Sequence, residues 1–411
     1  MKRIVSGLAV LYVALLVLGR SRLPMNAQWG DVLFPLLALA VWRAGPVSPW
    51  LGRQDWPLAV YLGVTLIAAL ASPGPAMGLQ ELFKQAYVAS ILLVFRQLGR
   101  DASLARRLQA AFVVSVAAMT AVSIAGVFVF APGRAPLSTF GIAGPLPLFG
   151  VVARLRGLFE APEMLGNALL IAFLFALALR EATSGGSRWR WTAIATLLAA
   201  GEFLTFSHSV AGFAVAAVSF MLPWMSSRAL RLLAWGTVVG VVITVNVASV
   251  VDPIPRDVPT AIDVRPVSID LFGTRVEGQL MSYAALKEVA WSAFRENPLT
   301  GIGPGRFTIE TRRAFREGRL ARGQVGLVPH CAPAGRLAES GVLGALSLLI
   351  LWASWFHGRG PALSAGTPCR RAALAAVIGL LVNSLNADVM NFRFLWLAVA
   401  WLSSPMESET A

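Results

Sequence analysis

The stretch LVPHCAPAGRLAESGVLG, residues 327–344, marks the point where a long charged loop gives way to an apolar helix. Pro333 suits the first turn of that helix, because proline lacks the N–H that would have no partner there. His330, one of three histidines in the chain, therefore lies just before the helix N-terminus. The partial positive charge of that end disfavours imidazolium and attracts anions such as phosphate. The stretch thus predicts a proton acceptor beside an anionic group.

The chain around this stretch is strongly apolar. Its 411 residues are 56% hydrophobic and only 14% charged, with a mean hydropathy of +0.68, which is far too apolar for a soluble domain. Apolar runs of about 15 to 23 residues recur, and a helix needs about that length to cross the hydrocarbon core. They predict an all-α, polytopic transmembrane bundle of about twelve spans. The runs centre near residues 4–19, 31–43, 57–72, 79–96, 108–130, 163–180, 191–206, 209–224, 230–250, 335–356, 372–387 and 391–403.

Arginine and lysine gather in alternate short loops, together with Lys2 and Arg3, so the positive-inside rule places both chain ends in the cytoplasm. The first apolar run is interpreted as a retained span, because no small-x-small cleavage site follows it. We therefore expect about nine spans in residues 1–250, an outward-facing loop in 251–334 and about three spans in 335–411. The expected location is the cytoplasmic (inner) membrane.

Charge and cysteine content restrict the partners. The net charge of +14 is largely accounted for by cytoplasmic loop ends and one outer cluster of arginines, which favours membrane lipids or an anionic lipid substrate over nucleic acid. Cys331 and Cys369 are expected on opposite sides of the membrane and cannot pair. The chain has neither Cys/His zinc spacing nor an Asp-x-Asp pair, so no metal ligands and no cofactor are predicted.

The outer loop divides into three parts. Residues 251–267 are proline-rich and are interpreted as a tether. After Gly273, apolar residues recur at three- and four-residue steps, which predicts an amphipathic helix that ends at Asn297-Pro298. The following GIGPG, residues 301–305, is interpreted as a structural turn, because Arg306 stands where GxGxxG has its last glycine. The arginines from 306 to 322 then favour a solvated helix face, or alternatively a surface that attracts phosphate-bearing lipids.

Four segments resemble the O-antigen ligase and O-antigen polymerase family, and they follow one another along the chain in the order expected for that family. The sequence RVEGQLMSYAALKEVAWSAFRENPLTGIGPGRF, residues 275–307, resembles the family's outer-loop helix and its "PLTGxGxGxF" turn. His330 followed by Glu339, Gly341 and Gly344 resembles the family's histidine before "ExGxxG". RGLFEAPEMLGNAL, residues 156–169, and FLTFSHSVAGFAV, residues 203–215, resemble its "GxFxxPNxxG" and "TxSRg" segments.

The resemblance implies an enzyme that transfers a glycan from a polyprenyl-diphosphate carrier to an acceptor hydroxyl on the outer face of the membrane. The acceptor would be lipid A core for a ligase, or another lipid-linked repeat unit for a polymerase. The diphosphate leaving group needs cations or backbone donors, and Arg275 is the first candidate. The attacking hydroxyl must lose a proton, and a neutral imidazole at His330 suits that step near pH 7.

Other site residues are expected around this pair. His208 stands where the family has an arginine, so it would bind diphosphate only if protonated; otherwise Arg156 or an outer-loop arginine such as Arg306 supplies the charge. The alternative for His208 is a helix-start histidine satisfied by neighbouring serines. Glu339 is either an orienting partner of His330 or Arg275, or a carboxylate favoured simply by its place near a helix start.

Further polar residues carry weaker expectations. Glu202 lies inside an apolar segment, where it could pair with a cation or reach water, and His357 is interpreted as an interfacial residue. Asn386, Asp388 and Arg393 could line the same cavity as the histidines.

Two other classes of protein compete with this interpretation. A transporter or lipid flippase would place broken helices in corresponding positions of two halves, a pattern that the sequence lacks. A purely structural membrane protein would leave the outer histidines and arginines unexplained.

Overall fold

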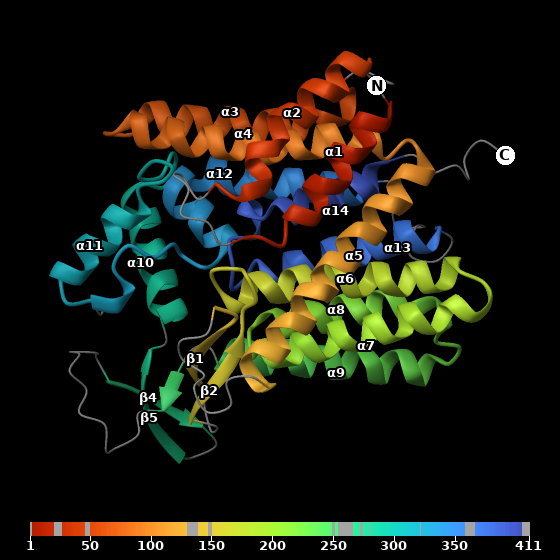
Figure 1. Cartoon of the computed structure of the whole chain (residues 1–411). Helices are drawn as coiled ribbons and strands as arrows, with labels where there is room; N and C mark the ends of the chain where they lie inside the picture. The colour runs from red at the N-terminus through yellow and green to blue at the C-terminus, as the bar shows by residue number, and fades with distance from the viewer. Residues whose placement is uncertain are drawn as a thin grey trace.

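The protein is a bundle of helices with a smaller group of helices and strands at one end. Most helices run along the bundle, α10 and α11 lie at one end of it, and the N-terminus is marked at the other end (Figure 1). The computed structural model describes residues 2–19, 27–45, 50–129, 139–146, 150–248, 251–253, 266–271, 274–280, 282–320, 322–357 and 366–404.

Each predicted apolar run coincides with a helix of the bundle. These runs form helices because a helix with an apolar face, or one that is apolar on all sides, can be buried against neighbouring helices or lipid. The helices are α1 (Lys2–Leu15), α2 (Trp29–Ala44), α3 (Trp56–Ala71), α4 (Pro75–Leu98), α5 (Ala102–Ile124), α6 (Pro162–Ala182), α7 (Arg188–Thr205), α8 (Ser209–Met221), α9 (Arg228–Ala248), α12 (Ala332–Phe356), α13 (Pro368–Asn383) and α14 (Arg393–Ser403).

Several of these helices can span a membrane by length and composition. Among the described residues, 4 helices meet both conditions, which confirms a helical membrane protein, while the number of about twelve spans stays a prediction. They are Ala102–Phe128, Pro162–Ala182, Arg228–Asn246 and Ala332–Phe356.

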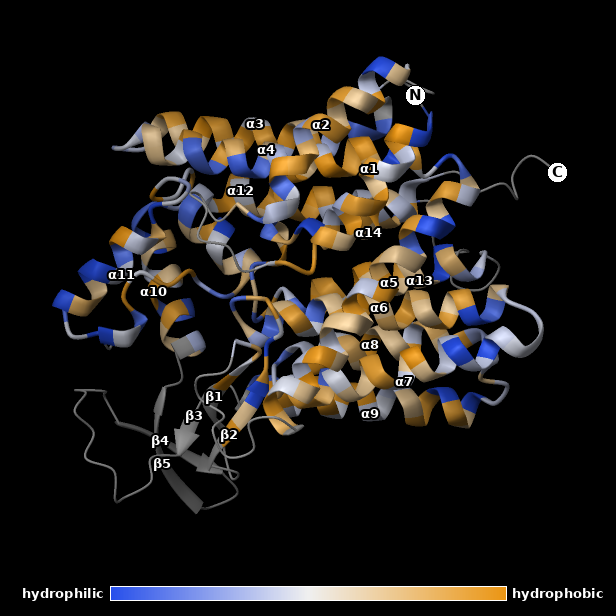
Figure 2. Cartoon of the chain, in the orientation of Figure 1, coloured by the Kyte–Doolittle hydropathy of each residue, from blue (hydrophilic) through white to orange (hydrophobic). Residues whose placement is uncertain are grey.

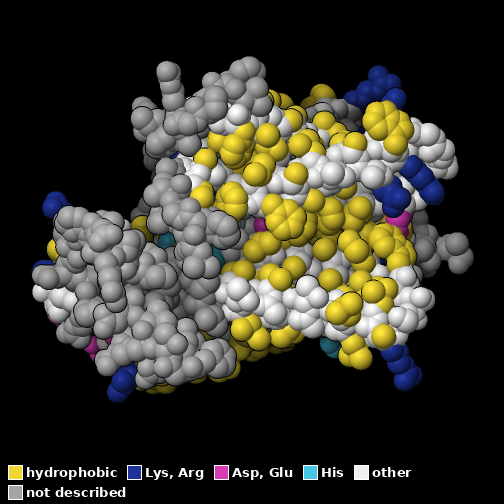
Figure 3. Space-filling model, turned by 90° about the horizontal axis from the view of Figure 1, so that it is seen from below, with side chains coloured by type: hydrophobic (Ala, Val, Ile, Leu, Met, Phe, Trp, Pro, Cys, Tyr) yellow, Lys and Arg dark blue, Asp and Glu magenta, His cyan; other side chains and the backbone are white. Residues whose placement is uncertain are grey.

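The surface of the bundle agrees with a lipid environment. Hydrophobic residues run along the helices and hydrophilic ones gather near their ends and on α11 (Figure 2). From below, hydrophobic side chains cover the middle of the face, and Lys and Arg lie toward its two ends (Figure 3). On α9, Leu232 and Leu233 are 74% and 68% exposed, which would be costly in water but is ordinary against acyl chains.

The core lies between α6, α13 and α14. Helix α6 is buried on nearly all sides, and the rings of Phe175 and Trp401 pack edge to face with centroids 4.7 Å apart. An ion pair joins two of these helices: Arg371 at the start of α13 donates to Glu181 at the end of α6. The arginine pattern predicts that this end of the bundle faces the cytoplasm.

The strands were not predicted. An antiparallel hairpin of β1 (Gly141–Leu146) and β2 (Gly150–Leu155) precedes α6, and a small sheet has the order β3-β5-β4. Its strands are β3 (Val251–Pro253), β4 (Pro266–Leu271) and β5 (Thr274–Leu280). The expected helix after Gly273 is therefore wrong over β5, because TRVEGQL alternates polar and apolar residues with a period of two. The helix begins only at Ser282, and most of the expected tether, residues 254–265, lies outside the described residues.

Helices α10 (Ser282–Glu296) and α11 (Phe307–Arg316), in the predicted outer loop, are joined by the glycine-rich turn, which docks into a break in α12. Gly341 has φ 65° and interrupts α12. Across the break, the N–H of Val342 donates to the carbonyl of Pro298, and the N–H of Ile302 donates to the carbonyl of Ala338 at 2.9 Å. The turn thus completes the hydrogen bonds of a broken membrane helix, which confirms the structural interpretation of GIGPG.

Candidate active site

His330 lies in the last turn before α12, as predicted. Cys331 is the N-cap of that helix, and the N–H of Ala332 donates to the carbonyl of Ser384 at 2.9 Å, which fixes the helix start against the end of α13. His330 itself has φ 49°, a left-handed conformation that non-glycine residues rarely adopt. Burial lowers the pKa of its imidazole below the ordinary 6.5, so His330 is neutral at pH 7.

A tyrosine stands between His330 and His208. The ring of Tyr283, in the first turn of α10, lies edge to face with His330 at 4.8 Å and with His208 at 5.0 Å between centroids. His208 precedes α8, and burial, reinforced by Arg154, lowers its pKa to about 4. At pH 7 both imidazoles are therefore uncharged, and His208 is poorly suited to replace a guanidinium.

Two cations border this aromatic cluster, and neither was singled out from the sequence. Lys287, one turn beyond Tyr283 on α10, donates to Oδ1 of Asn386 at 3.0 Å. Arg154, on β2, donates through Nε to the carbonyl of Thr205 at 3.2 Å. Neither makes an ion pair among the described residues, so a bound anion can pair with either of them.

The other predicted arginines belong to three different parts of the fold. Arg156 follows β2, where its N–H donates to the carbonyl of Phe140 at 3.0 Å. Arg306 precedes α11, and its guanidinium lies against Gly74 at the turn between α3 and α4. Arg275 belongs to β5, where its backbone is opposite Asp270; its side chain lies outside the described part of the structure.

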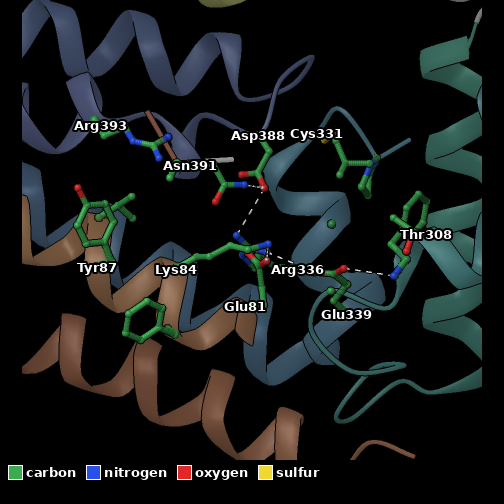
Figure 4. A pocket seen from close by; sticks show the side chains of 18 of the residues that line it. Glu81, Lys84, Tyr87, Thr308, Cys331, Arg336, Glu339, Asp388, Asn391 and Arg393 are labelled. Atoms are coloured by element: carbon green, nitrogen blue, oxygen red, sulfur yellow. Dashed lines mark hydrogen bonds and ion pairs between the residues drawn. The ribbon is translucent and has the colours of Figure 1, made fainter. Parts of the chain in front are cut away.

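A cavity of about 580 Å³ opens beside His330, between α4, α12 and the segment after α13. Figure 4 shows its charged residues facing one another. Val328, Pro329 and Cys331 contribute to the wall, so the two chain neighbours of His330 reach the cavity. Its polar and charged lining residues are Asp31, Glu81, Lys84, Tyr87, Thr308, Arg336, Glu339, Asp388, Asn391 and Arg393.

Arg336 is the centre of the charge network in this cavity. Its side chain is only 4% exposed, and Nε donates to the hydroxyl of Tyr61 at 2.9 Å. Its guanidinium lies 3.5 Å from Glu339 and 3.6 Å from Asp388, while Nη2 has no hydrogen-bond partner among the described residues. A buried guanidinium atom without an acceptor is costly unless a ligand or water supplies one.

Arg393 and Asp31 form a second ion pair in the cavity wall. Arg393 donates to both carboxylate oxygens of Asp31 at 2.5 and 3.1 Å, and the hydroxyl of Tyr87 donates to the same carboxylate at 2.6 Å. Asp388 and Arg393 both line this cavity, but its lining residues do not include His330 or His208, while Asn386 lies instead beside Lys287.

Two carboxylates have partners other than those expected. Glu339 lies against Arg336 and accepts from the N–H of Phe307 at 3.4 Å, rather than contacting His330. Glu202 is buried and accepts from the hydroxyl of Ser209 at 2.6 Å, rather than pairing with a cation. Among the described residues, no group of His, Cys, Asp and Glu side chains is placed to hold a metal ion.

Sequence signals existed for three of the four residues that the sequence analysis missed. Tyr283 and Lys287 are four residues apart, so a helix places them on one face. Arg336 is an ionisable residue inside a membrane helix, which is a functional hypothesis by default. Arg154 had no such signal, because its position depends on the hairpin that was not predicted.

The geometry agrees with a comparison to protein families. Residues 193–349 match the family model for O-antigen ligase, a range that contains His208, Tyr283, Lys287 and His330. None of the curated proteins matches the chain. The two histidines and the docked glycine-rich turn thus lie in one region, and this region is similar to O-antigen ligase.

Proposed function

We propose that the protein transfers a glycan from a polyprenyl-diphosphate carrier to an acceptor hydroxyl on the outer face of the cytoplasmic membrane, as an O-antigen ligase whose acceptor is lipid A core. The observation that carries this proposal is the neutral imidazole of His330, whose chain neighbours Pro329 and Cys331 line a charged cavity, within the region that matches O-antigen ligase. His330 accepts the proton of the attacking hydroxyl, which then bonds to the anomeric carbon as the diphosphate leaves.

The leaving diphosphate gains negative charge, so cations near His330 stabilise the transition state. Lys287 and Arg154 supply two of them, because each holds its charge against a neutral acceptor rather than a carboxylate. Arg275 remains the first outer-loop candidate for the same role. Arg156 and Arg306 bind phosphate farther from the reacting atoms, and His208 contributes a neutral ring.

The cavity accommodates the acceptor sugar. Its volume of about 580 Å³ is in the range of small-ligand sites. A sugar hydroxyl can accept a hydrogen bond from Nη2 of Arg336 and donate one to a neighbouring carboxylate such as Asp388 or Glu339. Since the arginines of the wall are paired with carboxylates, a neutral polyol suits this cavity better than a second phosphate.

The decisive experiment uses purified protein in lipid vesicles with a lipid-linked glycan donor and lipid A core acceptor. His330→Ala should reduce transfer at least about a hundredfold, since general-base catalysis contributes typically that much or more. His357→Ala, at the other end of α12, is the matched control and should transfer normally. A His330→Ala protein with full activity would remove the base from this proposal.

The same chemistry serves a repeat-unit polymerase, because donor and bond formation are shared and only the acceptor differs. Surface glycan from a strain that lacks the protein separates the two. Complete loss of core-attached glycan supports the ligase, whereas core bearing a single repeat unit supports the polymerase.

A further inference from the structure

We propose that Tyr283 is a positioning residue for His330: its ring, supported on the far side by His208, fixes the orientation of the imidazole and shields it from water. This inference rests on the proposed function, in which His330 is the base. In this role the rings of Tyr283 and His208 act through His330 and need not contact the reacting atoms.

The three rings come from three separate parts of the chain. His208 lies between α7 and α8, Tyr283 lies on α10, and His330 precedes α12. Both contacts are edge to face, at interplanar angles of 79° and 87°, which is a favoured geometry for aromatic pairs. The stack therefore ties the outer-loop helix to two elements of the bundle at the position of the candidate base.

Backbone strain is concentrated at this stack. Phe206 and His330, with φ 45° and 49°, are the only non-glycine residues with positive φ among those described. Phe206 ends α7 in the left-handed conformation, and His208 follows two residues later. Such conformations are costly and persist only where the surroundings enforce them, and they cluster at functional sites. Here they set the two outer rings of the stack.

The hydroxyl group of Tyr283 is dispensable in this arrangement. It makes no hydrogen bond among the described residues, so the ring rather than the phenol is the part that acts on His330. The same reasoning applies to His208, whose imidazole contacts Tyr283 through its ring. A phenylalanine at either position keeps the aromatic contact.

Shielding has an electrostatic consequence. Burial lowers the pKa of His330; Lys287 on α10 adds to this effect, while Glu163 on α6 and Asp388 after α13 oppose it. The other titratable groups next to the imidazole are His208, Tyr283 and Cys331. Removal of the Tyr283 ring would admit water, and the pKa of His330 would then rise toward its ordinary value of 6.5.

The test compares Tyr283→Phe with Tyr283→Leu in the reconstituted transfer assay. Tyr283→Phe should keep kcat within about twofold, whereas Tyr283→Leu should lower kcat about tenfold or more with little change in the donor KM, because misplacement of a base affects the chemical step. The acid limb of the pH–rate profile should move to higher pH in Tyr283→Leu and stay in place in Tyr283→Phe.

Direct titration checks the same point without activity. The chain has only three histidines, so histidine-selective isotope labelling can follow the pKa of His330 by NMR, which should rise in Tyr283→Leu. His208→Phe should leave kcat and the pKa of His330 as in the parent protein. His208→Ala should lower kcat and raise this pKa, but less than Tyr283→Leu does. These two variants test the inference even if Tyr283→Leu does not fold.

Three results would overturn the inference: parental kcat and pH profile in Tyr283→Leu, equal damage from Tyr283→Phe and Tyr283→Leu, or loss of transfer in His208→Phe. The parallel His330→Ala variant separates this failure from that of the proposed function. An inactive His330→Ala with a fully active Tyr283→Leu removes only the positioning role, whereas an active His330→Ala removes the base itself.

Discussion

Lys287 donates a hydrogen bond from Nζ to Oδ1 of Asn386 at 3.0 Å, and this bond joins the outer-loop helix α10 to the segment after α13. Asn386 donates in turn to Oδ1 of Asn246 at 3.1 Å, near the end of α9. Neutral amides leave the charge of the ammonium group uncompensated, and burial lowers the pKa of Lys287. An anion that binds beside Lys287 would offset this desolvation.

Lys287→Met should therefore weaken binding of the diphosphate donor. We expect the donor KM to rise about tenfold, since a charge-assisted hydrogen bond contributes roughly 1.5 to 3 kcal/mol. Initial rates at varied donor concentration measure this effect, and Lys2→Met, at the start of α1, is a control of the same chemistry. An unchanged donor KM in Lys287→Met would assign the lysine to structure alone.

Arg154 and Arg156 offer a direct comparison between neighbouring cations on and after β2. Arg154 acts electrostatically on both His208 and Tyr283, and it lies on β2 itself. Arg154→Gln should therefore raise the donor KM several-fold more than Arg156→Gln. The ratio of the two KM values, measured with protein of equal folded content, decides which arginine serves where the family has one at position 208. A larger effect from Arg156→Gln would reverse the assignment.

The helices of this fold could be predicted from the sequence because their signal is local. A run such as residues 163–180 is mostly apolar, and it forms α6 with nearly matching bounds. The strands could not be predicted in the same way. β5 gains its hydrogen bonds from β3 and β4, which are not local in sequence, so its seven-residue alternating segment resembles the start of the helix that follows it.

The site was predicted in part for a related reason. The position of His330 before a helix follows from Pro333 and from the change in hydropathy, which are both local features. Its neighbours depend on tertiary contacts: Tyr283 meets His208 across 75 positions of sequence, and Arg336 meets Tyr61 from a different part of the bundle. The periodicity of the sequence does not predict such long-range side-chain contacts. The family resemblance points to histidines and arginines, so it does not predict a role for Tyr283.

The pH dependence of transfer follows from the state of His330. Because burial holds its pKa below 6.5, the imidazole remains a base at pH values where an exposed histidine is protonated. Activity should be present above the lowered pKa and lost as pH falls through it. The acid midpoint of kcat should thus lie below pH 6.5, and Lys287→Met should shift it upward, since the ammonium group disfavours a second charge. An acid midpoint above 6.5 in the parent protein would contradict a buried neutral base.

Gly341 gives the last prediction, which concerns stability and the site together. A Cβ there would lie 2.2 Å from the carbonyl oxygen of Leu299, and the residue has φ 65°, so Gly341→Ala must displace the turn that fills the break in α12. We expect a loss of at least about 2 kcal/mol in stability from strain and lost backbone hydrogen bonds. Thermal unfolding in detergent measures this loss, with Gly63→Ala as the control, because no atom lies within 4 Å of a Cβ at that position. Since the turn also leads into α11, whose first residue Phe307 donates its N–H to Glu339, transfer activity should fall with stability. A stable but inactive Gly341→Ala would instead indicate that the break is needed for catalysis and not for folding.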